Sequence, residues 1–260
     1  MNYIDIHGHY AWGIDDGIPN IEQAKMALLK ASYEHINMIV ATAHVNQKTS
    51  FEDLRKIVQR IEELKILAQN YHIQVLYGSE LMLDHTIEQR MKAHLYLPIE
   101  NTDYVLCEYN VKHVDHNYFD HFYEYLISLL SRGYKPIVAH IERYYQNHNL
   151  DIGFIKYLIE MGCVIQVNSS SLLTNSIYRT NAMRLLDHQL VHVIASDTHR
   201  AHKSRYPNLD ECYCFLTQCG FDHNYLNILF YDNPKRIIEN QNTLQPKCKK
   251  RSLIQRCLKK

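Results

Sequence analysis

The sequence of 260 residues predicts an α/β fold, a distorted (β/α)7 barrel related to the eight-stranded TIM barrel. Short runs rich in Val and Ile alternate with longer segments in which apolar residues recur with helical period. The strand candidates are almost continuously apolar, as in parallel strands that helices cover on the outside. No stretch rich in Pro, Gly or Ser divides the chain in two. An open doubly wound sheet would show the same alternation, and periodicity alone does not separate the two folds.

The elements are predicted in alternating order along the chain. The strands fall at the apolar runs, which span 3–7, 38–43, 73–79, 103–108, 136–140, 163–168 and 191–196. Asn20 is a typical N-cap for the first helix, whose apolar positions mark one inner face. Apolar residues of helical period predict further helices over 51–70, 117–132, 151–161, 176–188 and 208–219. Gly133 and Gly162 stand where C-terminal caps are expected.

The charge of the chain is unevenly distributed. Lys and Arg number 28, as do Asp and Glu, but seven of the basic residues lie in 247–260, which has no acidic residue. The rest of the chain therefore carries 21 basic and 28 acidic residues, a net charge of −7. An acidic body of this kind disfavours binding to nucleic acid. We expect one domain over 1–246 and a basic, flexible tail over 247–260.

The compartment is predicted from what the sequence lacks. No apolar run approaches the roughly 20 residues that a membrane-spanning helix needs. The N-terminus shows no basic segment followed by an apolar one, so no secretory signal is predicted. Seven cysteines, an odd number without a paired framework, suit a reducing compartment. The expected location is the cytoplasm.

Histidines and carboxylates gather at the carboxyl ends of the predicted strands, where barrel active sites are built. A single histidine there is more often an ordinary polar residue, but so many at six strand ends indicate a metal site. They are too many for one ion, so two or three ions are expected. These residues are His7, His9, His44, Glu80, Glu108, His140, Asp197 and His199, with Asp15 and Asp16 in the first loop.

Phosphate chemistry suits a cluster of this kind. Bound ions make hydroxide available at neutral pH and stabilise both oxygens of an in-line displacement. Arg143 and Arg205 are candidates to bind the remaining phosphate oxygens, whereas Arg200 is better explained as a surface ion pair. No cysteine is followed six positions later by arginine, and neither a G-K-[ST] phosphate loop nor a G-x-G-x-x-G motif occurs.

Several blocks of the sequence resemble a known family. They are Ile4-Asp-Ile-His-Gly-His9, Gly13-Ile-Asp-Asp-Gly17, Ala41-Thr-Ala-His44, Gly78-Ser-Glu80, Ala139-His-Ile-Glu-Arg-Tyr144, Ala195-Ser-Asp-Thr-His199 and Asn233-Pro234. The pattern resembles the PHP (polymerase and histidinol phosphatase) superfamily over nearly the whole chain. More closely, it is similar to the manganese-dependent bacterial protein-tyrosine phosphatases of capsule and exopolysaccharide loci, the CpsB/CapC/YwqE type.

The resemblance implies a PHP-type barrel, a set of ligands and a substrate. It implies Mn²⁺, with Fe, Co or Zn as alternatives, and a metal-bound hydroxide that attacks phosphorus without a phosphoenzyme. It implies as substrate the phosphorylated, Tyr-rich tail of a bacterial tyrosine autokinase that controls polysaccharide export. Arg143 and Arg205 would bind the phosphoryl group. The ions would be held by His7, His9, Glu80 and Asp197, by Glu80, Glu108 and His140, and by Asp16, His44 and His199, the spacing favouring Asp16 over Asp15.

Other interpretations remain open at this stage. The same site could hydrolyse a small phosphomonoester such as histidinol phosphate, and a metal-binding barrel without turnover or a nuclease are further alternatives. Gly8 stands where the family commonly has Cys between its two histidines. The helix near residues 20–35 is a candidate subunit interface of a homo-oligomer.

Overall fold

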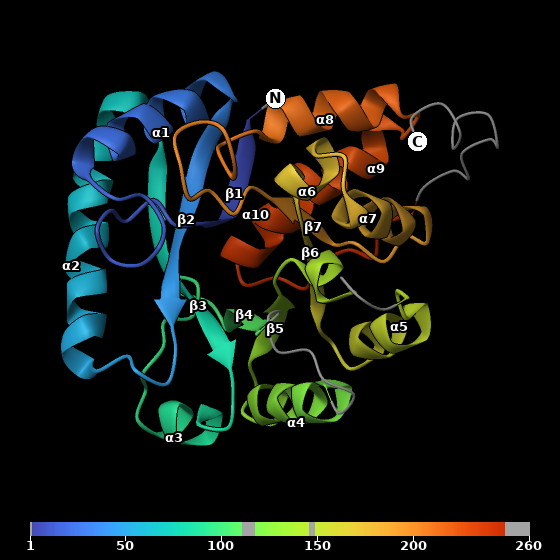
Figure 1. Ribbon diagram of the computed structural model, residues 1–260, viewed down its shortest axis with the longest axis horizontal. Coiled ribbons are helices and arrows are strands. Elements are labelled where there is room, and N and C mark those ends of the chain that lie inside the picture. Colours follow the sequence, from blue (N-terminus) through green and yellow to red (C-terminus); the bar gives the residue numbers. More distant parts are fainter. Residues whose placement is uncertain (1, 111–117, 146–148, 248–260) are drawn as a thin grey trace.

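The computed structural model describes residues 2–110, 118–145 and 149–247, and seven parallel strands form a nearly closed barrel in it (Figure 1). The strands stand side by side in the order in which the chain makes them, from β1 to β7. A doubly wound sheet would reverse its direction of winding part-way, so the barrel prediction is confirmed. The strands are β1 (Tyr3–Gly8), β2 (Ile36–Val45), β3 (Gln74–Leu83), β4 (Tyr104–Tyr109), β5 (Lys135–Val138), β6 (Val164–Asn168) and β7 (Val193–Ala195).

The first and last strands are joined at their carboxyl ends. The Asp197 N–H donates to the His7 carbonyl at 2.9 Å, and the His9 N–H donates to the Thr198 carbonyl at 2.8 Å. The buried carboxylate of Asp5, in the middle of β1, accepts hydrogen bonds from the backbone N–H and the hydroxyl of Ser196. Asp5 therefore helps to hold the end of β7 against β1, where the chain brings His7 and Asp197 together.

Helices cover the outside of the barrel, and Figure 1 shows α1 and α2 on the side of β2, with α5 and α7 across the molecule. All six predicted helices are present within a few residues of their expected ends. In the described ranges, four further helices of five or six residues were not predicted, because they are too short to show helical periodicity. The helices are α1 (Ile21–Tyr33), α2 (Phe51–Ala68), α3 (Ile87–Lys92), α4 (Tyr118–Leu130), α5 (Ile152–Glu160), α6 (Ser169–Leu173), α7 (Ile177–Asp187), α8 (Leu209–Gln218), α9 (His223–Asn227) and α10 (Asn233–Ile238).

The helix ends follow local chemistry. The Asn20 side chain accepts a hydrogen bond from the Gln23 N–H at 3.0 Å and so caps α1. Gly133 and Gly162 follow α4 and α5 with φ of 83° and 100°, a conformation that favours glycine. No helix in the described part of the chain is both long and apolar enough to cross a membrane. The predicted tail over 247–260 lies, apart from Lys247, outside the described residues, so the division at residue 246 stays a prediction.

The barrel interior changes from apolar to polar along several strands. Successive residues of a strand face opposite sides, so every second residue shares the interior face. The lower interior contains buried apolar side chains, among them Val40, Leu106 and Ala195. Further along the same faces, two or four residues toward the carboxyl end, stand the residues that can bind metal. The series are Val40–Thr42–His44, Tyr104–Leu106–Glu108 and Val193–Ala195–Asp197. An apolar floor thus supports a polar site at the carboxyl ends of the strands.

One buried histidine outside the site links the bottom of the barrel to the segment that follows α10. His192 is 4% exposed, and its Nδ1 accepts a hydrogen bond from the Ile165 N–H at 3.1 Å. Its Nε2 donates a hydrogen bond to the side-chain oxygen of Gln245 at 3.2 Å. Burial lowers the pKa of His192 to about 4. The fold therefore holds this imidazole neutral, with each ring nitrogen in a defined role.

We expect His192 to make the fold sensitive to acid. Its pKa is lower in the folded chain than the ordinary value of 6.5, so its contribution to stability is present above pH 6.5 and is lost as the pH falls toward 4. The loss amounts to about 2.5 kcal/mol between pH 7.5 and 4.5. Urea unfolding in the presence of a chelator should show this loss in the wild type. His192→Gln keeps one acceptor and one donor but does not titrate, so its free energy of unfolding should depend less steeply on pH. The same pH dependence in the wild type and the variant would contradict this role of His192.

Candidate metal centre

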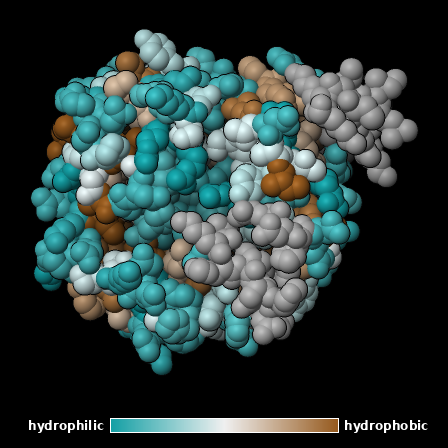
Figure 2. Space-filling model, in the orientation of Figure 1, coloured by the Kyte–Doolittle hydropathy of each residue, from teal (hydrophilic) through white to brown (hydrophobic). Residues whose placement is uncertain are grey.

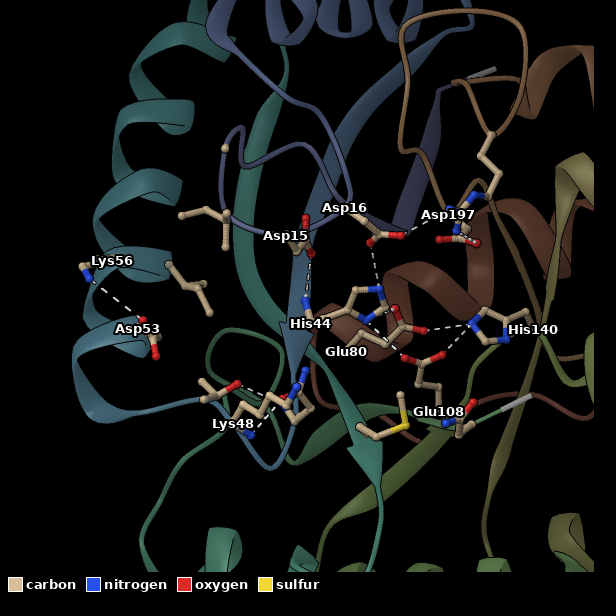
Figure 3. A pocket seen from close by; sticks show the side chains of 18 of the residues that line it. Asp15, Asp16, His44, Lys48, Asp53, Lys56, Glu80, Glu108, His140 and Asp197 are labelled. Atoms are coloured by element: carbon tan, nitrogen blue, oxygen red, sulfur yellow. Dashed lines mark hydrogen bonds and ion pairs between the residues drawn. The ribbon is translucent and has the colours of Figure 1, made fainter. Parts of the chain in front are cut away.

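The predicted ligand residues meet at one end of the barrel, and Figure 3 shows six of them around a cavity. His44, Glu80 and Glu108 lie inside β2, β3 and β4, whereas His140 and Asp197 lie just beyond β5 and β7. Donor atoms gather in three groups, within each of which all ligand atoms lie within 4.8 Å of one another. The groups are His7, His9, Glu80 and Asp197; His9, Asp16, His44 and His199; and His44, Glu80 and Glu108.

The first group is buried and compact. Glu80 Oε2 lies 3.2 Å from His7 Nε2 and 3.1 Å from His9 Nε2. Asp197 Oδ1 lies 3.4 Å from His7 Nε2 and 3.6 Å from His9 Nε2. None of these four side chains is more than 1% exposed. Two donors that bind one ion at about 2.1 Å lie roughly 3.0–3.4 Å apart, so this spacing is that of a shared ion.

Each of the other two groups shares one residue with the first group, either His9 or Glu80, and both of them contain His44. Asp16 Oδ1 lies 3.3 Å from His44 Nε2 and 3.4 Å from His199 Nε2. His44 Nδ1 lies 3.2 Å from both Glu80 Oε2 and Glu108 Oε1. His140 joins the same side, because its Nε2 lies 2.9 Å from Glu80 Oε1 and 3.5 Å from Glu108 Oε2. Glu80 therefore contributes oxygens to two adjoining groups.

A set of hydrogen bonds outside the groups fixes which ring nitrogen faces inward. His7 Nδ1 donates to the Gln166 side-chain oxygen at 3.2 Å, and His9 Nδ1 donates to Asp15 Oδ2 at 2.7 Å. His199 Nδ1 donates to the Asp197 carbonyl at 2.9 Å. In each case Nε2 is left to face the cluster. Outer partners of this kind orient imidazoles around metal ions.

Several buried atoms at the cluster have no partner within the described residues. Glu80 Oε2, Asp197 Oδ1 and His199 Nε2 are buried and accept or donate no hydrogen bond there. In addition, the Nε2 atoms of His7 and His9 face each other at 3.4 Å. A buried polar atom left unpaired costs on the order of 1–3 kcal/mol. Divalent ions would satisfy all of these atoms at once, so the donor set fits metal ions.

The backbone is left-handed at two of the candidate ligands. His140 and Asp197 have φ of 34° and 53°, values that residues other than glycine rarely adopt. Hydrogen bonds hold both in place, from the His140 N–H to the Gln166 side-chain oxygen at 2.8 Å and from the Asp197 N–H to the His7 carbonyl. Such conformations collect at functional sites, where surrounding structure maintains them.

The cluster is also strongly coupled electrostatically. Burial favours the neutral acid, but the His7 and His44 imidazoles outweigh it and hold the pKa of Glu80 well below its ordinary value. Burial likewise opposes protonation of His7, yet the Glu80 and Asp197 carboxylates raise the pKa of His7 to about 9. The His199 and His44 imidazoles beside Asp16 lower the pKa of its carboxyl group. Without ions, protons on the imidazoles have to balance the buried carboxylates.

Two arginines border the cluster. Arg143 Nη1 lies 3.5 Å and Arg205 Nη1 3.3 Å from Asp197 Oδ2, and both side chains line the cavity above the ligand groups. Asn168 Nδ2 donates to the same carboxylate oxygen at 2.8 Å. Arg205 Nη2 also lies 3.8 Å from Asp16 Oδ2, so both guanidinium groups stand beside the cavity and the ligand groups. Arg200 does not face this cavity, because its Nη1 donates to the carbonyls of Asp16, Gly17 and His199.

The structure brings the residues that the sequence analysis put at the site to one end of the barrel. Arg200 lies outside the ligand groups, but the surface ion pair expected of it is not found among the described residues, because its Nη1 donates to backbone carbonyls instead. The sequence analysis missed the supporting side chains Gln166 and Asn168. Their signal was available, because they are the polar alternate positions of the otherwise apolar strand β6. Asp15 contacts His9 Nδ1 and the His44 N–H, outside the groups, whereas Asp16 lies within one.

Gly8 is explained by its neighbour Tyr10. A Cβ atom at position 8 would lie 2.4 Å from Tyr10 Cε2, and this ring is fully buried. The ring therefore fills the space that a larger residue would need. A side chain between His7 and His9 would displace this packing beside the cluster.

Comparison with known proteins gives a match over almost the whole chain. The model of the family described as "Capsular polysaccharide synthesis, CpsB/CapC" matches residues 3–239. The tyrosine-protein phosphatase CpsB of Streptococcus agalactiae serotype III is 31% identical over 248 residues, which are 91% of this chain and 98% of that protein. The tyrosine-protein phosphatase YwqE of Bacillus subtilis is 26% identical over 250 residues, 92% of each chain.

Solved structures agree with these matches. A chain from the crystal structures of YwqE from Bacillus subtilis and CpsB from Streptococcus pneumoniae, described as metal-dependent tyrosine phosphatases, superposes with a TM-score of 0.74 and 26% identity. The superposition covers 95% of this chain and all of that one. A phosphotriesterase homology protein from Escherichia coli shares the fold, with a TM-score of 0.58, 12% identity and coverage of 90% and 97%.

We predict that Mn²⁺ stabilises the metal-stripped protein. At a free concentration of 100 times the dissociation constant, one bound ion adds about 2.7 kcal/mol, so Tm should rise by at least about 5 °C. Glu80→Gln, which removes the charge that two ligand groups share, should lose most of this rise. Glu88→Gln is the matched control, because Glu88 pairs with Arg132 on the surface and not with the cluster. The ligand assignment would be contradicted by equal rises in all three proteins.

Proposed function

Since the chain belongs to the CpsB/CapC family of capsular polysaccharide synthesis proteins, we propose that it is a metal-dependent protein-tyrosine phosphatase. It hydrolyses the phosphomonoester of phosphotyrosine to tyrosine and inorganic phosphate. The observation that carries this proposal is the set of three adjoining ligand groups beside two arginines, in a chain whose relatives are named tyrosine-protein phosphatases. The geometry supplies the chemistry of a phosphatase, and the relatives supply the substrate.

Nine side chains hold the ions in this proposal. The mixture of five imidazoles and four carboxylates suits borderline divalent ions, and Mn²⁺ is the ion that we propose, with Fe, Co and Zn as alternatives. Two or three ions are bound. One is held by His7, His9, Glu80 and Asp197, a second by Glu80, Glu108 and His140, and a third by Asp16, His44 and His199.

The metal ions, the two arginines and the residues that hold the arginines have separate roles in the reaction. When bound, the ions lower the pKa of water and stabilise negative charge on phosphoryl oxygens. Arg143 and Arg205 bind other phosphoryl oxygens, because a guanidinium matches a phosphate with paired donors. Asp197 Oδ2 and Asn168 hold these arginines and the carboxylate in one arrangement. The positioning is complete before the substrate arrives, which reduces the cost of reaching the transition state.

The reaction needs no covalent intermediate on the protein. Among the described residues, no cysteine lines the cavity, and Cys107, Cys163, Cys212 and Cys219 are buried elsewhere. Water attacks phosphorus directly, the bond to the tyrosyl oxygen breaks, and the phosphate leaves from the arginines. The catalytic residues beside the metal ligands are therefore Arg143 and Arg205.

We also propose the biological setting of the reaction. The substrate is the phosphorylated, Tyr-rich tail of a bacterial tyrosine kinase that controls capsule or exopolysaccharide synthesis, in keeping with the family's description. The cytoplasm is the proposed location, because the five described cysteines are free, as in a reducing compartment. A homo-oligomer would bury the exposed apolar side chains of α1, which are Ile21, Met26, Leu29 and Tyr33.

The direct test is phosphate release by the metal-stripped protein, with and without added Mn²⁺. A phosphotyrosyl peptide and histidinol phosphate serve as alternative substrates. We expect release from the peptide that depends on Mn²⁺, and little from histidinol phosphate, since the cavity is broad and continues into a neighbouring one. A preference for histidinol phosphate would keep the site but replace the substrate. No release from either would disprove the proposed function.

Arg143→Ala should lower kcat/KM for the phosphotyrosyl peptide by about 100-fold, because one charge-assisted donor to the transition state is lost. Metal binding should persist, since Arg143 belongs to no ligand group. The control is Arg184→Ala, which removes an exposed arginine on α7. Steady-state kinetics and metal analysis of both variants check this, and wild-type kinetics for Arg143→Ala would remove that residue from the site.

A further inference from the structure

The cavity above the ligand groups is larger than a phosphoryl group requires. Its volume is about 770 Å³, and it reaches from the cluster to the 46–49 segment and the first turns of α2 (Figure 3). A second cavity of about 400 Å³ adjoins it, since both are lined by Asn46, Lys48, Met82 and Asn110. Together they provide space for residues that flank the phosphotyrosine in a polypeptide. The face of the molecule in Figure 2 is mostly hydrophilic, with scattered hydrophobic residues.

Lys48 lies where the two cavities meet, and within the described part of the chain it forms no ion pair. Among the residues that the structure describes, no carboxylate lies within 4 Å of its ammonium group. Lys56, which also lines the larger cavity, differs in this respect, because it lies 3.9 Å from both Glu52 and Asp53. Of the two described lysines that line the larger cavity, Lys48 is therefore the one whose ammonium group has no carboxylate beside it and is available to a ligand.

The second cavity has few other charges. Asp84 lines it, but Arg90 Nη2 lies 3.0 Å from the Asp84 carboxylate and compensates it. Tyr109 and Tyr125 contribute stacked rings whose centroids are 6.3 Å apart. The rest of the described lining is apolar or uncharged, except for His85. A cavity with an aromatic wall and one uncompensated cation suits a side chain that ends in an anion.

The segment that carries Lys48 is held in shape before any ligand binds. The Asn46 N–H donates to Thr49 Oγ1 at 3.0 Å, and the Thr49 N–H donates to the Asn46 carbonyl at 3.0 Å. The Lys48 N–H donates to the Asn46 side-chain oxygen at 2.9 Å. A capping box between Ser50 and Asp53 follows at once and begins α2. Such preorganisation lowers the entropic cost of binding.

We propose that Lys48 binds an anionic side chain of the substrate polypeptide, close in sequence to the phosphotyrosine that is hydrolysed. This inference rests on the proposed function and adds a specificity-determining residue to it. The anion is a carboxylate or a second phosphotyrosine, because both present oxygens to an ammonium group. Opposite charges across such a contact select one partner against others.

The test measures binding without turnover. Peptides carry a non-hydrolysable phosphonate analogue of phosphotyrosine, and a neighbouring position, varied over three residues on either side, carries Gln, Glu or a second phosphonate. Fluorescence anisotropy gives Kd for the Mn²⁺-loaded protein at low ionic strength. At the best position, we expect at least one anionic peptide to bind about threefold to fivefold more tightly than the Gln peptide, since a partly exposed ion pair contributes modestly. Whether Glu or the second phosphonate gives the gain identifies the anion.

Two variants decide whether Lys48 is responsible. Lys48→Met should reduce the ratio between the anionic and Gln peptides to near one, with Tm measured to verify folding. Lys156→Met should keep the wild-type ratio, because Lys156 is exposed on α5 and lines neither cavity. Equal ratios in the wild type and Lys48→Met, or no preference in the wild type at any position, would overturn the inference.

Turnover of the matching phosphotyrosyl peptides separates this inference from the proposed function. A preference that depends on Lys48, without any phosphate release, would refute the phosphatase and keep the anion site. Phosphate release without such a preference would refute the anion site alone.

Discussion

The burial of two carboxylates at the carboxyl end of the barrel is the constraint on which the site depends. Glu80 and Asp197 are each 1% exposed, so water cannot solvate their charge. Removing an ion from water costs several kcal/mol even after the protein relaxes. The surrounding imidazoles, the two arginines and Asn168 reduce that cost, but Glu80 Oε2 and Asp197 Oδ1 still accept no hydrogen bond from the described residues. Divalent ions would complete the balance, and such ions can activate water for the hydrolysis of a phosphomonoester.

The topology of the barrel makes this burial possible. Parallel strands bring their carboxyl ends to one side, so residues as far apart in sequence as His7 and Asp197 meet without long connections. Asp5 holds Ser196 and thereby the end of β7, while Gln166 contacts both His7 and the backbone of His140. These buried hydrogen bonds position candidate metal ligands at the carboxyl ends of three strands. Stability and function therefore depend on the same polar network.

The sequence was sufficient for the strands, the six longer helices and the identity of the residues at the site, because periodicity and strand ends are local patterns. It was not sufficient for Gln166 and Asn168, whose roles depend on neighbours across the barrel. Nor could it show the left-handed backbone of His140 and Asp197, since tertiary hydrogen bonds impose it. The sequence also could not show that Lys48 has no carboxylate beside it among the described residues. Whether a lysine is paired depends on how far the carboxylates of other segments lie from it in the folded chain, and the sequence does not give these distances.

The central claim is that these side chains bind metal ions in adjoining positions. Anomalous X-ray scattering at the manganese edge, from crystals of the protein reconstituted with Mn²⁺, tests it most directly. The account predicts two or three anomalous peaks, one within the group of His7, His9, Glu80 and Asp197 and the others beside Glu108 and Asp16. Crystals in which the reconstituted protein shows no peak among these side chains would contradict the account.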